Sequence, residues 1–191
     1  MGMRNAARRY TVDEVLAFPD DGNRYELVDG ELLVTPSPAQ VHQLILARLF
    51  PQLYQYIAPH NTIAHAFFAP GDIIWGERHY VQPDTFVVPA SEVTGNWRDC
   101  QTLLLAVEVI SPSSEAADRV TKRQLYQKRN VATYWVVDAK ARLVEVWHPG
   151  DDRPQVEAFT LRWRLAPDVE ECVVDVHTLF GALPERATQS V

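Results

Sequence analysis

The chain has 191 residues, a formal net charge of -7, 47% hydrophobic residues and 23% charged residues. This length and composition predict one soluble globular domain with a hydrophobic core of its own. The acidic balance argues against a protein whose whole surface binds nucleic acid, although a local basic patch or an acidic metal site remains compatible with it. The two cysteines, Cys100 and Cys172, form no CxxC pair and indicate neither a disulfide framework nor a zinc site.

No apolar segment follows the basic N-terminal residues, and no apolar run approaches the roughly 20 residues of a membrane span. We therefore expect a cytoplasmic protein with no membrane partner. Residues 1–9 are expected to form a flexible arm, residues 10–183 a single domain, and residues 184–191 a flexible tail.

Two local signals predict the structure of the N-terminal part. Thr11 opens a capping-box sequence, which predicts a helix from this residue onward. Asp29-Gly30 lies between two runs of alternating apolar residues, which predicts a β-hairpin. Pairing the residues that flank this turn places Glu26 and Glu31 on one face of the hairpin.

A long helix is predicted over residues 39–57, because apolar residues recur there at helical spacing. Pro51 should kink this helix or split it in two, since proline lacks the N–H that the helix requires. Short strands are then predicted at residues 62–68, 72–75 and 81–88.

Residues 103–110 are apolar enough to form a buried strand, and a helix over 115–128 and a strand over 134–138 follow. This order favours a right-handed crossover with locally parallel strands. The remaining predicted elements are strands at 142–148, 155–163 and 172–176 and a short helix at 177–180. Together these elements predict an α+β or mixed α/β domain built on one central sheet.

Two acidic residues, Asp84 and Glu108, lie within apolar segments that are predicted to be strands. If the strands are neighbours, the two carboxylates can meet, and they would repel unless a cation lies between them. A divalent cation such as Mg2+ or Mn2+ prefers oxygen ligands of this kind. Alternatively, either acid could cap a turn or pair with an arginine.

Asp118, Lys122 and Tyr126 recur at intervals of four residues, so they share one face of the predicted helix that follows Glu108. That face could point to the end of the strand or to solvent, where an Asp–Lys pair contributes little. His42 lies one position away from the apolar stripe of its helix, which is also compatible with a surface histidine. No HExxH, GxGxxG, Walker A or GxSxG motif is present.

The order of several motifs resembles the Uma-type family of restriction endonucleases, within the PD-(D/E)XK nuclease superfamily. The motifs are YELVDGELL, PSP with His42 four residues on, QPDTFVV, LAVEVISPSS, DRVTKRQLY and VATYWVVD, and they span roughly residues 10–150. This resemblance implies a restriction-endonuclease-like central mixed sheet flanked by helices. It also implies a Mg2+-dependent site that cleaves phosphodiester bonds.

The resemblance assigns Asp84 to the aspartate of the Pro-Asp pair and Glu108 to the acid of the (D/E)XK segment. Ile110 stands where that segment carries its lysine, and the resemblance implies that the lysine has moved to Lys122 on the next helix. Further catalytic residues are expected at Glu31 and His42, with Glu26 as a weaker candidate, and the expected metal ligands are Asp84, Glu108 and the backbone carbonyl of Val109.

The sequence therefore predicts a Mg2+- or Mn2+-dependent endonuclease that acts on nucleic acid, with DNA as the first expectation. One alternative is a nuclease-fold protein that binds or regulates without cutting, because the net charge offers no obvious DNA-binding surface. A second is a hydrolase that uses the two acids as general acid and base and would stay active in EDTA. A homodimer is expected, with Trp97 and Trp147 either covering its interface or packed in the core.

Overall fold

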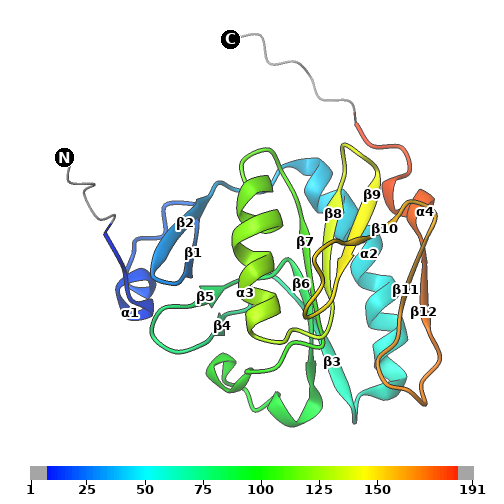
Figure 1. Ribbon diagram of the computed structural model, residues 1–191, viewed down its shortest axis with the longest axis horizontal. Coiled ribbons are helices and arrows are strands. Elements are labelled where there is room, and N and C mark those ends of the chain that lie inside the picture. The colour runs from blue at the N-terminus through cyan, green and yellow to red at the C-terminus, as the bar shows by residue number, and fades with distance from the viewer. Residues whose placement is uncertain (1–7, 185–191) are drawn as a thin grey trace.

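The computed structural model describes residues 8–184, which are built around a six-stranded sheet with the strand order β10-β9-β8-β7-β6-β3 (Figure 1). Its strands are β3 (Ala64–Phe68), β6 (Thr85–Pro89), β7 (Leu105–Val109), β8 (Tyr134–Asp138), β9 (Leu143–Trp147) and β10 (Gln155–Glu157). β7 and β8 are parallel, and every other pair of neighbours is antiparallel. The predicted mixed α+β fold class is confirmed.

The connection from β7 to β8 contains a turn, a π-helical segment, η4 (Ala117–Lys122), and then helix α3 (Arg123–Lys128). The helix predicted over 115–128 is confirmed in its bounds, and the π-helical form of residues 117–122 is a feature that the sequence did not predict. π-helical turns are rare and frequently occur at functional sites. This one carries two of the residues that surround the candidate site, Asp118 and Lys122.

The N-terminal part forms a separate four-stranded sheet with the order β2-β1-β5-β4. The elements are helix α1 (Val12–Leu16) and strands β1 (Arg24–Val28), β2 (Glu31–Thr35), β4 (Ile73–Ile74) and β5 (Tyr80–Val81). The predicted capping box of α1 and the predicted hairpin register, in which Val28 pairs with Glu31, are both confirmed. Asp29 and Gly30 have φ angles of 49° and 79°, as a two-residue turn of the hairpin type requires.

The single strand predicted over residues 81–88 is in fact two strands in different sheets. β5 ends at Val81 in the four-stranded sheet, and β6 begins at Thr85 in the six-stranded sheet. Pro83 lies between them and has no N–H to contribute to a strand ladder. Asp84 therefore lies in the bend before β6, where the chain crosses from one sheet to the other, and not inside a strand.

Helices cover both faces of the six-stranded sheet (Figure 1). Helix α2 (Gln40–Ile57) packs on one face and shares its core with β11 (Thr160–Trp163), β12 (Cys172–Asp175) and α4 (Val176–Phe180), whereas α3 packs on the other. Of the two effects predicted for Pro51, a kink or a split, the split is wrong, because α2 continues through this residue. Three short 3-10 helices, Ala58–His60, Ala90–Glu92 and Trp97–Asp99, complete the described elements.

The predicted arm and tail lie almost entirely outside the described residues. Within the described part, the Arg8 side chain donates to the Glu14 carboxylate and the Arg9 side chain donates to the backbone carbonyl of Asp29. Trp147 is buried in the core beneath α3, and Trp97 packs against the rings of Phe67 and Phe86. None of the helices between residues 8 and 184 is both long and apolar enough to cross a membrane.

Candidate active site

Asp84 and Glu108 come together where β6 meets β7. The antiparallel register pairs Thr85 with Val107, so the preceding Asp84 lies opposite Glu108. Residues that lie opposite one another in antiparallel strands project to the same face of the sheet. Both carboxylates are buried, each with 1% of its residue surface exposed.

Three groups hold the Asp84 carboxylate. Arg24 Nη1 donates to Oδ1 at 2.9 Å, while His42 Nε2 and the backbone N–H of Val109 lie 2.8 Å from Oδ2. Burial alone would raise the pKa of Asp84, but the hydrogen bond and charge of His42, the Arg24 guanidinium and the Val109 N–H outweigh it. Together they lower the pKa of Asp84 to about 2, so this carboxylate is ionised at neutral pH.

Lys122 lies at the centre of three further carboxylates. Its Nζ is 2.7 Å from Glu26 Oε2, 3.0 Å from Glu108 Oε1 and 3.3 Å from Asp118 Oδ1. The lysine itself is only 2% exposed. Burial opposes its charge, but the surrounding carboxylates raise the pKa of Lys122 well above its usual value. Lys122 is therefore a fixed cation and not a proton acceptor.

The environment of Glu108 disfavours the ionised form of its carboxylate. Lys122 and the hydroxyl of Tyr126, at 3.1 Å, both donate to its Oε1, and no hydrogen bond from the described residues reaches its Oε2. Burial raises the pKa of Glu108 well above its usual value, and the charges of Asp84, Asp118 and Glu26 add to the effect. Within residues 8–184, Arg24 and Lys122 are the arginine and lysine that pair with the four carboxylates, so the cluster has a formal charge of -2 when all four are ionised.

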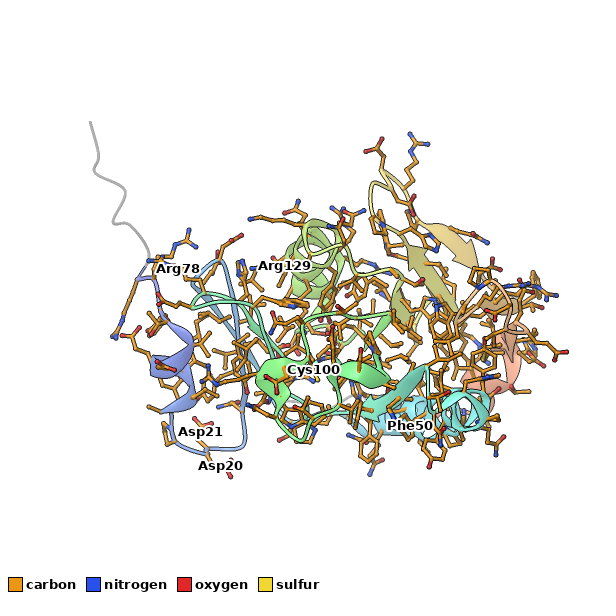
Figure 2. The ribbon with its side chains drawn as sticks, turned by 90° about the horizontal axis from the view of Figure 1, so that it is seen from below. Asp20, Asp21, Phe50, Arg78, Cys100 and Arg129 are labelled. Carbon is orange, nitrogen blue, oxygen red and sulfur yellow. The ribbon has the colours of Figure 1, made fainter. Side chains whose placement is uncertain are left out.

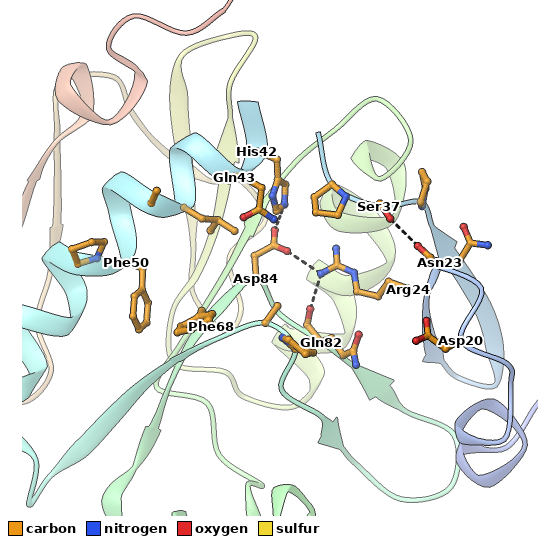
Figure 3. A pocket seen from close by; sticks show the side chains of 18 residues that line it. Asp20, Asn23, Arg24, Ser37, His42, Gln43, Phe50, Phe68, Gln82 and Asp84 are labelled. Atoms are coloured by element: carbon orange, nitrogen blue, oxygen red, sulfur yellow. Dashed lines mark hydrogen bonds and ion pairs between the residues drawn. The ribbon is translucent and has the colours of Figure 1, made fainter. Parts of the chain in front are cut away.

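A cavity of about 580 Å³ opens beside this cluster, between α2, β1 and the segment that precedes β6 (Figure 3). Asp84, Arg24 and His42 line one end of it, whereas Glu108 and Lys122 do not line it. A substrate in the cavity would therefore meet Asp84, Arg24 and His42 first. Glu108 and Lys122 would not contact it directly, because they do not line the cavity.

His42 connects the cavity to Asp84 through one ring nitrogen. Because the ionised Asp84 can only accept hydrogen bonds, His42 Nε2 must be the donor. Its other nitrogen, Nδ1, is buried and has no hydrogen-bond partner among the described residues. Unsatisfied buried polar atoms are uncommon in native proteins and often have a functional explanation.

Not every residue selected from the sequence lies in this group. Glu31 is exposed at the start of β2 and, within residues 8–184, makes no hydrogen bond or ion pair with Asp84, Glu108 or Lys122. Glu26 belongs to the group instead, because its carboxylate lies 2.7 Å from Lys122 Nζ. Arg24 was missed, although it lies two residues before Glu26 and so shares its face of β1.

The residues present are compatible with a divalent cation. Mg2+ is commonly held by only one or two carboxylates together with water and substrate phosphate, which matches the apposed Asp84 and Glu108 and the surplus negative charge of the cluster. Across residues 8–184, no group of three or more His, Cys, Asp or Glu side chains is arranged to hold a metal ion. The protein alone therefore supplies a partial ligand set.

The chain belongs to the Uma2 family, described as "Putative restriction endonuclease", whose model matches residues 12–176. This result confirms the resemblance seen in the sequence and supports nuclease function.

A solved structure from Anabaena variabilis ATCC 29413, described as "a putative nuclease belonging to DUF820", has the same fold. The two chains are 20% identical and superimpose with a TM-score of 0.72, over 89% of this chain and 97% of that chain. No match was found among curated proteins.

Proposed function

We propose that this protein hydrolyses phosphodiester bonds of nucleic acid with the help of Mg2+ or Mn2+. DNA is the substrate to be tested first. The observation that carries the proposal is the apposition of Asp84, which lines the cavity, and Glu108, which lies opposite it, with Lys122 fixed 3.0 Å from Glu108. Paired carboxylates beside a permanent cation suit a reaction in which negative charge develops on a phosphate.

Asp84 and Glu108, with the carbonyl of Val109, are the groups that would hold the cation. When bound, a divalent cation lowers the pKa of a water molecule and offsets charge on the scissile phosphate. Lys122 fixes the position of Glu108 and supplies positive charge that does not depend on pH near neutrality. Arg24 lines the cavity and can contact a substrate phosphate directly, since a guanidinium forms strong paired hydrogen bonds to phosphate oxygens.

His42 is suited to positioning or proton transfer at the cavity. Its Nε2 is bound to Asp84, which fixes the ring, and its Nδ1 has no partner within the described residues. A histidine held in this way can donate to or accept from a group near it. No role follows for Glu31, which is exposed at the start of β2.

The test is cleavage of plasmid and of labelled oligonucleotides with Mg2+ or Mn2+, by the wild type and by Glu108→Gln and Lys122→Met. Both substitutions should reduce the cleavage rate at least about 100-fold, the scale seen when one electrostatic stabiliser is removed. Lys140→Met is the matched control, because Lys140 is exposed in the turn between β8 and β9. Equal rates in wild type and both site variants would refute the proposal.

One observation favours a second candidate, a nuclease-fold module that binds but does not cut. Both oxygens of Asp84 are already occupied, by Arg24 on one side and by His42 and Val109 on the other. Calorimetric titration with Mn2+ separates the two candidates. Binding that Glu108→Gln abolishes supports the nuclease, and absence of binding in the wild type supports the module.

A further inference from the structure

The cavity has two chemically different ends. At one end lie Arg24, His42 and Asp84, and Figure 3 shows Phe50 and Phe68 to one side of them. The aromatic end is completed by apolar residues of α2 and of the segment after β3, namely Leu46, Ala47, Pro51, Ala69 and Pro70. A ligand that fills the cavity needs an anionic or polar part beside Arg24 and a flat apolar part beside the phenylalanines.

The aromatic side chains are unusually accessible. Phe68 is 61% exposed and Tyr54 is 55% exposed. The ring of Phe50 lies between them, with its centroid 4.9 Å from that of Phe68 and 6.0 Å from that of Tyr54. This row of three rings extends beyond the cavity, because Phe50 and Phe68 line the cavity and Tyr54, one turn further along α2, does not. In Figure 2, Phe50 lies at the same edge of the molecule as Asp20, another residue that lines the cavity.

The charges around the cavity argue against a regular duplex as its occupant. Arg24 is the only lysine or arginine among the described residues that line it, and Asp20 and Asp84 are acidic. Duplex binding rests on many lysine and arginine contacts to phosphates. A volume of about 580 Å³ is in the range of small-molecule sites, which suits one or two nucleotides and is far too small for a double helix.

We propose that the cavity binds unpaired nucleobases of a single-stranded nucleic acid, with a base against Phe68 and Phe50 and the adjoining phosphate beside Arg24. The inference rests on the proposed function, whose substrate class it names. Every base has a flat face that stacks on an aromatic ring, so binding of this kind tolerates many sequences. It also explains how an acidic protein can bind nucleic acid without a broad basic surface.

The test measures binding apart from cleavage. Fluorescence anisotropy with a short labelled oligothymidylate, in EDTA, compares the wild type with Phe68→Ala, and the same strand annealed to oligoadenylate provides the duplex. Wild type should bind the single strand at least about tenfold more tightly than the duplex. Phe68→Ala should weaken single-strand binding at least about fivefold, the lower end of the loss when one stacking ring is removed.

Two further variants make the result specific to stacking. Phe68→Tyr should restore binding because it keeps the ring, whereas Phe68→Leu keeps an apolar side chain and should not. Phe159→Ala is the matched control, because Phe159 is 78% exposed and does not line the cavity. Since Phe68 is largely exposed, its variants should keep the circular dichroism spectrum of the wild type.

The outcomes separate this inference from the proposed function. Tighter binding to the duplex, no binding to the single strand, or equal binding by Phe68→Ala and wild type would overturn the inference, even if the protein cleaves DNA. Loss of cleavage in Glu108→Gln without loss of binding would support both. Self-association that Phe68→Ala abolishes in sedimentation would assign the aromatic row to a second copy of the chain and would overturn the inference.

Discussion

Lys122 Nζ lies 2.7 Å from Glu26 Oε2 and 3.0 Å from Glu108 Oε1, so one buried cation holds carboxylates from two different sheets. Glu26 belongs to β1 of the four-stranded sheet and Glu108 to β7 of the six-stranded sheet. The Lys122 ammonium group is therefore part of the candidate site and also connects the four-stranded sheet to the six-stranded sheet.

Replacement of this lysine should destabilise the protein strongly. Lys122→Met leaves Glu26, Glu108 and Asp118 buried around an apolar side chain, and a buried ion pair that loses one partner typically costs about 3–5 kcal/mol. The decrease in the free energy of unfolding should be larger at pH 8 than at pH 5, because protonation at pH 5 neutralises part of the negative charge that Lys122 no longer balances. Urea unfolding in EDTA at both pH values measures it.

A double variant provides the control for this prediction. Adding Glu26→Gln to Lys122→Met removes one of the three carboxylates that have lost the lysine and should recover part of the lost free energy of unfolding. Cleavage should not recover with it. Equal destabilisation of the single variant at pH 5 and pH 8 would contradict the charge-based explanation.

Removal of the divalent cation should lower thermal stability only if Glu108 is intact. A ligand that binds the folded state alone raises the free energy of unfolding by RT ln(1 + [L]/Kd), or about 2.7 kcal/mol at 100 times Kd. We expect Mn2+ to raise the melting temperature of the wild type and EDTA to reverse the rise. Glu108→Gln, measured by the same scanning calorimetry, should show no Mn2+ effect, and a rise equal to that of the wild type would place the cation elsewhere.

Asp84 should contribute to stability at neutral pH and lose this contribution in acid. Its pKa of about 2 in the folded protein is below the ordinary value of 3.8, so its stabilisation is present above about pH 4 and disappears as the pH falls through 2. The difference corresponds to about 2 kcal/mol. Unfolding in EDTA between pH 5 and pH 2 should show a shallower pH dependence for Asp84→Asn than for the wild type.

The matched control for Asp84 is Asp152→Asn, because Asp152 is exposed on the surface. This control should follow the pH dependence of the wild type. The contribution assigned to Asp84 would be wrong if Asp84→Asn did the same.

Both cysteines should react slowly with Ellman's reagent in the folded protein. Burial raises the pKa of Cys172 to about 11 and also raises the pKa of Cys100, which lies near the charges of Glu92 and Asp99. Little thiolate is then present at pH 8, and both side chains are buried. Labelling should become fast in urea, and the time course of thiol absorbance measures the change. Rapid native labelling of Cys172 would show that the packing of β11 and β12 opens readily.

Local signals in the sequence correctly predicted the capping box of α1 and the register of the β1–β2 hairpin. The crossover from β7 through η4 and α3 to β8 brings Lys122 to Glu108. The family resemblance selected Lys122, whereas spacing alone left its helix face open between the strand end and solvent. Arg24 was missed because its contact with Asp84 joins residues 60 positions apart in different parts of the fold. No local periodicity encodes such a contact.

Two prolines led to opposite errors in the predicted secondary structure. Pro51 was expected to interrupt α2, yet the tertiary contacts of Leu49 and Leu53 on either side keep that helix whole. Pro83 was expected to lie inside a strand, yet it marks the change of sheet that places Asp84 in the wall of the cavity.

The change of sheet at residues 82–84 also determines when the site can form. Gln82 N–H binds Glu26 on one side of this crossing, and Asp84 binds the N–H of Val109 on the other. A chain in which only the six-stranded sheet has folded would hold Asp84, Glu108 and Lys122 but would lack Arg24 and Glu26, which belong to β1. The site is therefore expected to be complete only when the two sheets are packed together, and separation of the sheets would remove the Arg24 contact of Asp84 and the Glu26 contact of Lys122.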